Sequence, residues 1–242
     1  MNALTIKSWS LSDPGKRRKH NEDSFVDRPD LGIWAVADGA GGHSAGDYAS
    51  GLLAEQLEAI PPGLSASELL AEVRMRVSTT HDALREEAGR RGDDVTIAST
   101  IVVMMIRNQH FACLWAGDSR AYLLRDGELT QITKDHSLVQ EMVDAGTIRA
   151  EDAESHPRAN VITRAVGAPL EEEFELDKVS DRLLPGDRFL LCSDGLCKTL
   201  PADDIATLLS TTDDTPPTDL LIAEALARNV TDNVTAVAVE VG

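Results

Sequence analysis

Acidic residues stand at four points of the sequence, and three of these points adjoin a segment typical of a β-strand. The four acidic segments are Asn21-Glu22-Asp23, Asp38-Gly39, Asp194-Gly195 and Asp232-Asn233. Carboxylates that a fold gathers at strand ends repel one another unless cations lie between them. Carboxylate oxygens without a cluster of His or pairs of Cys favour Mg²⁺, Mn²⁺ or Ca²⁺ over Zn²⁺. The sequence therefore predicts a site for divalent cations.

The composition limits the classes of partner. With 242 residues, 42% of them hydrophobic, the chain can form one large domain or two small ones around a proper core. Its net charge of −18 argues against a nucleic-acid surface, because phosphate backbones are bound by clustered Lys and Arg. The strongly basic segment is Lys16-Arg17-Arg18-Lys19-His20. We expect no nucleic-acid partner.

The cysteines and the apolar segments predict a cytoplasmic protein. Cys113, Cys192 and Cys197 are odd in number and lack metal-site spacing, which fits a reducing compartment. Residues 1–13 contain no basic start followed by an apolar core, so no export signal is expected. The longest apolar stretch, 97–106, is too short to cross a bilayer, so no membrane anchor is expected.

Short segments rich in β-branched and aromatic residues, and bounded by Gly, Asp or Asn, predict the strands. They are 3–10, 32–37, 99–106, 110–116, 121–124, 128–132, 188–193 and 234–241. The Asp126-Gly127 pair between two of them is typical of a hairpin, so neighbouring strands are expected to be antiparallel.

Helices are predicted between these strands. Ser65 and Glu68 form a capping-box pattern ahead of Leu69, Val73 and Val77, which repeat at helical spacing. Further helices are predicted at 46–60, 137–145, 202–209 and 218–228. Helices that face sheets without alternating βαβ units indicate an α+β layered fold.

Residues 146–173 depart from this pattern. They are polar and acidic, with little periodicity, and they predict an irregular flap. Long loops in compact domains are commonly functional, and a merely mobile surface excursion fits the composition equally well.

Seven segments, in order along nearly the whole chain, resemble motifs of the metal-dependent protein phosphatases, the protein phosphatase 2C family. They are Asp13-x-Gly15-x-x-Arg18-x-x-Asn21-Glu22-Asp23, Ala37-Asp38-Gly39-x-Gly41-Gly42-His43-x-x-Gly46, Ala116-Gly117-Asp118-Ser119-Arg120-x-Tyr122, Thr133-Lys134-Asp135-His136-Ser137, His156-Pro157-Arg158-x-Asn160-x-Ile162-Thr163-Arg164, Cys192-Ser193-Asp194-Gly195-Leu196 and Asp232-Asn233-Val234-Thr235. The resemblance implies a four-layer α-β-β-α sandwich, with two antiparallel sheets flanked by helices, in a single catalytic domain over residues 1–242. It also implies a binuclear Mg²⁺ or Mn²⁺ site at one end of the sandwich.

The resemblance also implies the roles of single residues. Asp38 is expected to bridge the two metal ions, and Arg18 is expected to bind the substrate phosphate with its planar guanidinium. Two metals that share a water lower its pKa and present hydroxide to a phosphate monoester, so no covalent phosphoenzyme is expected. The implied metal ligands are Glu22, Asp23, Asp38, the carbonyl of Gly39, Asp194 and Asp232.

The resemblance also concerns a third and weaker metal ion. Bacterial relatives bind it with the positions of Asp118 and Asp194, and many carry a further oxygen ligand four residues after the latter. This chain has Lys198 at that position. Because an ammonium cannot bind a cation and can neutralise either aspartate, we hypothesise that Lys198 weakens or replaces the third metal.

Other polar residues near these motifs have plainer roles. Asn21 is expected to hydrogen-bond the local backbone rather than bind metal. His136 is expected to be structural, and Ser137 and Gln140 are expected to form a capping box for the next helix. Without the other motifs, the Asp-Gly pairs and Asp232-Asn233 would be interpreted as turns.

His43 also stands near the predicted metal ligands. Eukaryotic relatives place a His two residues after the bridging Asp as a candidate general acid, and this chain has Ala40 there. His43 is therefore expected to be structural and to cap the helix that begins near Gly46.

The resemblance as a whole predicts a cytoplasmic, bacterial-type phosphatase that acts on phosphoserine and phosphothreonine in proteins. The expected partners are a Ser/Thr kinase or its targets, and the chain looks similar to compact relatives that regulate type VI secretion. One alternative is a stage-specific regulator that dephosphorylates an anti-sigma-factor antagonist. The other alternative is a non-catalytic regulator that binds phosphoproteins without turning them over.

Overall fold

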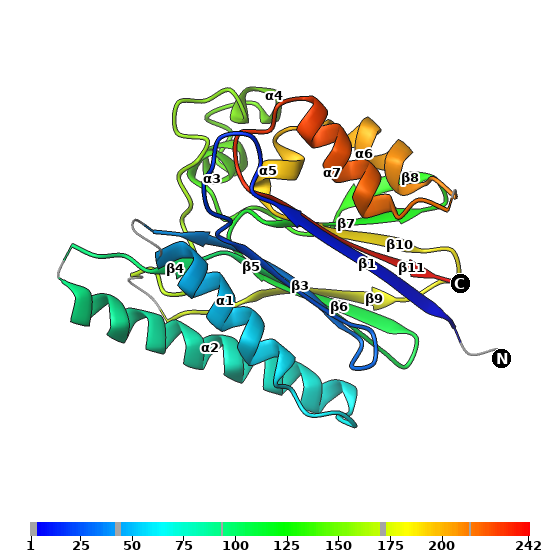
Figure 1. Ribbon diagram of the computed structural model, residues 1–242, viewed down its shortest axis with the longest axis horizontal. Coiled ribbons are helices and arrows are strands. Elements are labelled where there is room, and N and C mark those ends of the chain that lie inside the picture. The colour runs from blue at the N-terminus through cyan, green and yellow to red at the C-terminus, as the bar shows by residue number, and fades with distance from the viewer. Residues whose placement is uncertain (1–3, 42–44, 93, 170–172, 213) are drawn as a thin grey trace.

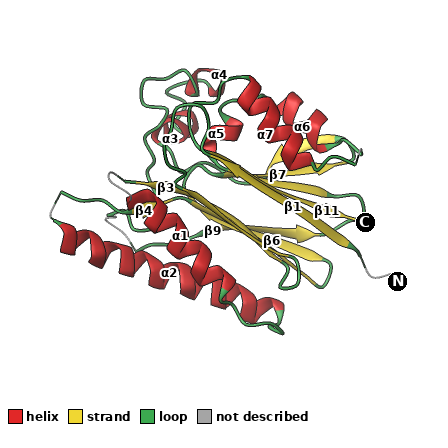
Figure 2. Cartoon of the chain, in the orientation of Figure 1, coloured by secondary structure: helices red, strands yellow, loops and turns green. Residues whose placement is uncertain are grey.

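Two antiparallel sheets pack face to face and helices cover their outer faces (Figures 1 and 2). The computed structural model describes residues 4–41, 45–92, 94–169, 173–212 and 214–242. The first sheet has the strand order β1 (Ile6–Asp13), β11 (Val234–Val241), β10 (Arg188–Cys192), β7 (Arg120–Arg125) and β8 (Glu128–Gln131). The second sheet has the order β2 (Asp23–Arg28), β3 (Ile33–Ala40), β5 (Ile101–Arg107), β6 (His110–Ala116) and β9 (Asp177–Arg182), with the short β4 (Ala98–Ser99) beside β3.

The helices divide between the two sheets. On the second sheet lie α1 (Ala45–Glu58) and α2 (Ala66–Arg91), and on the first lie α5 (Asp194–Cys197), α6 (Ala202–Leu209) and α7 (Pro217–Ala227). The short α3 (Leu138–Asp144) and α4 (Ala150–Ala153) belong to the long connection from β8 to β9 (Figure 1). The predicted four-layer α-β-β-α sandwich is confirmed.

Alternating side chains of each central strand enter two different hydrophobic cores. In β3, Ile33 and Ala35 face α1 and α2, whereas Trp34 and Val36 enter the core between the sheets. In β10, Phe189 enters the core between the sheets. Because both faces of these strands are covered, their sequences are continuous apolar runs rather than alternating ones.

Three strand predictions were wrong or incomplete, and all three concern sheet edges. β1 lies at Ile6–Asp13, later than the predicted 3–10, and β2 (Asp23–Arg28) and β9 (Asp177–Arg182) were not predicted. Each of these strands ends its sheet. Edge strands carry charged residues that discourage pairing with another chain, so they lack the apolar run that marks a central strand.

Helix ends follow the predicted caps in part. Ser65 and Glu68 form the reciprocal capping box at the start of α2, as predicted. Ser137 caps α3 by accepting the Gln140 N–H at 3.3 Å, but the Gln140 amide donates to Asp144, so the box predicted there is half formed. The predicted role of His43 lies outside the described residues.

Two isolated bridges tie the predicted flap to the rest of the fold. Ile162 pairs with Ser137, and Val166 pairs with Ser99. The described part of the flap, 146–169 and 173, otherwise contains only the single turn of α4 as regular structure. Among the described residues no helix has the length and apolar content needed to cross a bilayer.

We expect Phe189→Ala to lower the free energy of unfolding by about 3–5 kcal/mol, because the ring is fully buried between the sheets and its removal leaves a cavity. Its centroid lies 4.8 Å from that of Phe111 in an edge-to-face contact. Urea unfolding measures the change. Met75→Ala on α2 is the control, because Met75 is 52% exposed and its loss should change stability by no more than about 0.5 kcal/mol. Equal effects of the two substitutions would contradict this account of the core.

Candidate metal centre

The acidic segments of both sheets meet at one end of the sandwich. In the second sheet, the antiparallel register of β2 and β3 places Asp23 opposite Asp38. In the first sheet, Asp194 stands two residues after the end of β10, and Asp232 stands two residues before the start of the neighbouring β11. Like charges directly opposite each other on paired strands are destabilising, so this arrangement favours a cation between them.

Asp23 is fixed by hydroxyl groups of the opposite sheet. Its Oδ2 accepts hydrogen bonds from Ser193 Oγ and Thr235 Oγ1, both at 2.7 Å. Its Oδ1 is buried and has no hydrogen-bond partner among the described residues. Burial raises the pKa of Asp23 to about 6, although the two hydroxyl donors oppose the shift. A buried carboxylate oxygen without a partner is a position that a cation can satisfy.

Asp38 lies at the centre of the negative charge. Its backbone N–H donates to Thr100 Oγ1 at 3.1 Å, and its carbonyl accepts the Thr100 N–H at 2.8 Å. Both backbone polar groups of Asp38 are therefore hydrogen-bonded to Thr100. Removal of its carboxyl from water, followed by the charges of Asp23 and Asp194, raises the pKa of Asp38 well above its ordinary range. The neighbouring negative charges thus oppose the ionisation of Asp38.

Glu22 is positioned by hydrogen bonds to its backbone carbonyl, and two neighbouring glycines leave the space that it needs. Its carbonyl accepts the Gly39 N–H at 3.1 Å and the Ser50 hydroxyl at 2.6 Å. A Cβ on Gly46 would lie 2.8 Å from the Glu22 carboxyl carbon, and one on Gly39 would lie 2.0 Å from the Gly46 carbonyl oxygen. The missing side chains let α1 approach β3 and leave space for the Glu22 carboxylate. Burial raises the pKa of Glu22 as well.

Asn233 organises the loop that carries Arg18, a role that the sequence did not suggest. Its Oδ1 accepts the Glu22 N–H at 2.9 Å, and its Nδ2 donates to the carbonyls of Pro14 and His20, both at 3.0 Å. In the sequence, the position of Asn233 beside Asp232 in a predicted turn was the only indication of this role. Asn21 makes the predicted backbone contact, because its Oδ1 accepts the Asp23 N–H at 3.2 Å.

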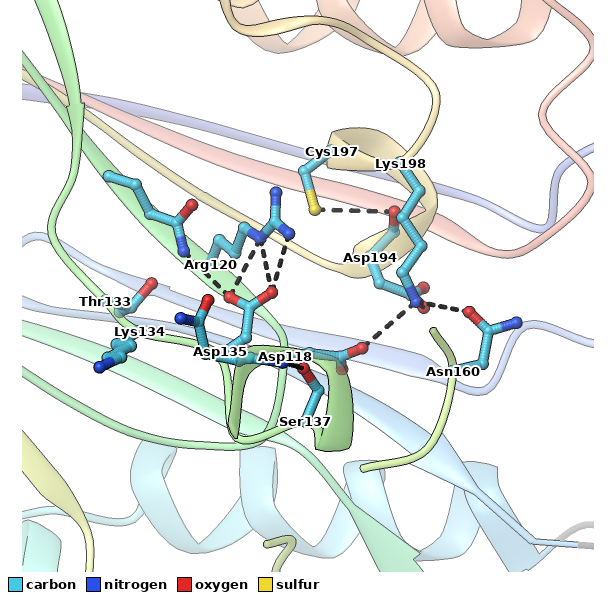
Figure 3. Close-up of polar contacts among 12 residues, drawn as sticks. Asp118, Arg120, Thr133, Lys134, Asp135, Ser137, Asn160, Asp194, Cys197 and Lys198 are labelled. Carbon is cyan, nitrogen blue, oxygen red and sulfur yellow. Dashed lines mark hydrogen bonds and ion pairs between the residues drawn. The ribbon is translucent and has the colours of Figure 1, made fainter. Parts of the chain in front are cut away.

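Two basic side chains neutralise part of the acidic cluster. Arg18 meets Asp232 with a fork, Nε to Oδ1 and Nη2 to Oδ2, each at 2.9 Å. Lys198 Nζ lies 2.6 Å from Asp194 Oδ2 and 3.3 Å from Asp118 Oδ2 (Figure 3). Among the residues that the structure describes, no group of three or more His, Cys, Asp or Glu side chains is arranged to hold a metal ion.

The donor set nevertheless fits hard divalent cations. It consists of oxygens, it contains two buried carboxylate oxygens without a partner, Asp23 Oδ1 and Asp118 Oδ1, and its members raise one another's pKa by mutual repulsion. The pair of Arg18 with Asp232 is 53% and 42% exposed, and such surface pairs are worth only about 0–1 kcal/mol. A cation can therefore compete for Asp232 at small cost.

The sequence profile of the family described as protein phosphatase 2C matches residues 16–227. The chain belongs to the protein phosphatase 2C family. The serine/threonine protein phosphatase PstP of Mycobacterium tuberculosis is 36% identical over 98% of this chain, which spans only 45% of that relative. The serine/threonine phosphatase Stp of Listeria welshimeri is 34% identical, with 95% of this chain and 93% of that protein covered.

Solved structures of protein phosphatase 2C relatives show the same fold. PppA of Pseudomonas aeruginosa, described as a key regulatory component of its type VI secretion system, is 42% identical, covers 98% of both chains and has a TM-score of 0.88. The catalytic domain of PstP in complex with two manganese ions is 34% identical, covers 99% of both chains and has a TM-score of 0.86.

We expect Gly46→Ala to weaken the fold by about 1–3 kcal/mol, because the new methyl group overlaps the Glu22 carboxyl group and the Gly39 carbonyl. Urea unfolding of the purified variant measures this loss. Gly51→Ala in the same helix is the matched control, since a Cβ there meets nothing within 4 Å. It should gain about 0.5–1 kcal/mol from the better helix former. A gain from both substitutions would show that Glu22 does not need the space beside Gly46.

Proposed function

We propose that this protein is a metal-dependent phosphatase that removes phosphate from phosphoserine and phosphothreonine in proteins. The convergence of Asp23, Asp38, Asp194 and Asp232 from two sheets at one end of the sandwich carries this proposal. Membership of the protein phosphatase 2C family and the manganese bound to the PstP catalytic domain support it. We also propose that residues 1–242 act as one catalytic domain.

The metal ligands in this proposal are Glu22, Asp23, Asp38, the Gly39 carbonyl, Asp194 and Asp232. Two Mn²⁺ or Mg²⁺ ions held there would lower the pKa of a water between them and polarise the phosphoryl group. Ser193 and Thr235 keep Asp23 in one orientation, and Thr100 does the same for the backbone of Asp38. The protein thereby supplies a fixed set of carboxylates before any substrate arrives.

Arg18 is proposed to bind the substrate phosphate. Its guanidinium is about half exposed at the edge of the acidic cluster, and its planar fork suits two phosphoryl oxygens. The neighbouring Lys16, Arg17 and Lys19 are exposed and add a positive charge to this otherwise acidic chain. A phosphorylated protein segment would be attracted to this loop.

The setting of the reaction is also a proposal. Cys113, Cys192 and Cys197 are free thiols, which supports a reducing cytoplasm. An opposing Ser/Thr kinase and its targets are the proposed partners, and the similarity to PppA favours a system of the type VI secretion kind. A non-catalytic phosphoprotein-binding regulator is the competing function.

Turnover with and without metal distinguishes the two functions. We expect hydrolysis of p-nitrophenyl phosphate and of a phosphothreonine peptide with Mn²⁺ or Mg²⁺, none with EDTA, and none for Asp38→Asn or Asp194→Asn, because each loses a charged ligand oxygen. Released phosphate is measured, with the exposed Asp82→Asn on α2 as the control of equal charge change. Binding of metal and phosphopeptide without release of phosphate would establish the regulator instead.

Arg18→Lys tests the phosphate-binding role. It should lower kcat/KM for the phosphopeptide roughly tenfold to hundredfold, because it keeps the charge but loses the second hydrogen bond to the phosphoryl group, worth about 1.5–3 kcal/mol. Arg17→Lys, in the same exposed loop, should have little effect. If the Mn²⁺ concentration for half-maximal activity changes while kcat/KM at saturating Mn²⁺ does not, Arg18 serves Asp232 rather than the phosphate.

A further inference from the structure

A single ammonium group joins three separate parts of the chain beside the candidate metal centre. Lys198 caps the C-terminal end of α5, and its Nζ contacts Asp194 Oδ2 at 2.6 Å, Asn160 Oδ1 at 3.0 Å and Asp118 Oδ2 at 3.3 Å (Figure 3). Asp194 begins the same helix, Asp118 lies in the turn between β6 and β7, and Asn160 belongs to the flap. The contacts thus bring the flap against a proposed metal ligand.

The three oxygens around Lys198 form a donor set for a cation. Asp118 is only 3% exposed and its second oxygen has no partner among the described residues. Two carboxylates and one amide oxygen are ligands that hard cations prefer. In the described ranges, Lys198 is the basic side chain that forms an ion pair with Asp118. The nearby Arg120 instead donates hydrogen bonds of 2.8–3.1 Å to Asp135.

Lys198 lies between two carboxylates of opposite charge. Its Nζ is 2.6 Å from Asp194 Oδ2 and 3.3 Å from Asp118 Oδ2. The side chain is 30% exposed, so most of its surface is enclosed by these partners. An ammonium and a divalent ion cannot share the same oxygens, because their positive charges repel each other.

We propose that Lys198 is a built-in cation that replaces a divalent ion between Asp118 and Asp194 and fastens the flap through Asn160. The replacement of a divalent ion rests on the proposed function, since it takes Asp194 as a ligand of the two-metal centre. The attachment of the flap does not rest on that function, because the ammonium binds Asn160 whether or not metal is present. Lys198 is a positioning residue in this scheme: it holds one oxygen of Asp194 and leaves the other for the metal centre.

The first experiment counts bound manganese. Native mass spectrometry and titration calorimetry with Mn²⁺ alone compare the wild-type protein with Lys198→Asp, which exchanges the ammonium for a carboxylate. We expect Lys198→Asp to bind one ion more than the wild-type protein. Lys134→Asp is the matched control, because Lys134 forms an exposed pair with Asp144 and its reversal should not add an ion. An equal number of ions in the wild-type protein and Lys198→Asp would overturn the substitution of metal by Lys198.

The second experiment measures the flap in EDTA and needs no metal. Hydrogen exchange of residues 156–161 should be several-fold faster in Lys198→Met, which keeps the length of the side chain but loses the charge, while Lys134→Met should leave it unchanged. Unchanged exchange in Lys198→Met would overturn the attachment of the flap. If the wild-type protein binds no Mn²⁺ at all, the proposed metal-dependent phosphatase is refuted. Faster exchange in Lys198→Met than in that wild-type protein would still support the attachment of the flap.

Discussion

The buried carboxylate of Asp23 connects the two sheets, and the candidate centre depends on that connection. One of its oxygens is held by hydroxyl groups from β11 and from the residue after β10, so the second sheet is bonded to the first at the level of the acidic residues. Thr235 also donates its backbone N–H to Ser193 Oγ at 3.0 Å, which orients the second donor. These directional bonds fix the alignment of the two sheets at the acidic residues, where the non-directional packing of apolar side chains does not specify it.

Basic side chains neutralise part of the negative charge at this end of the molecule. An acidic protein with a net charge of −18 gathers several carboxylates in one place, and it supplies two cations of its own at that place. The pair of Arg18 with Asp232 is exposed, whereas the pair of Lys198 with Asp194 is more enclosed. The first pair is therefore more accessible to ligands than the second.

Sequence patterns were sufficient to locate the central strands and the acidic segments that the two sheets bring to one end of the sandwich. β6 and β11 lie where the apolar runs placed them, because burial on both faces leaves an unambiguous pattern. The edge strands β2 and β9 were not predicted, because strands with charged residues at an exposed sheet edge lack this apolar pattern. The contact of Lys198 with Asn160 could not be predicted either, because the two residues are 38 positions apart and meet only through the path of the flap.

The ends of the strands far from the acidic cluster have a different use. The turns after β2, β5 and β7 lie at residues 29–32, 108–109 and 126–127, at the opposite ends of strands that lead to or from the candidate centre (Figure 1). A strand of seven residues such as β6 spans about 20 Å, so these turns are remote from the carboxylates. Fluorescent labels or affinity tags placed there would report on the protein without obstructing the candidate metal centre.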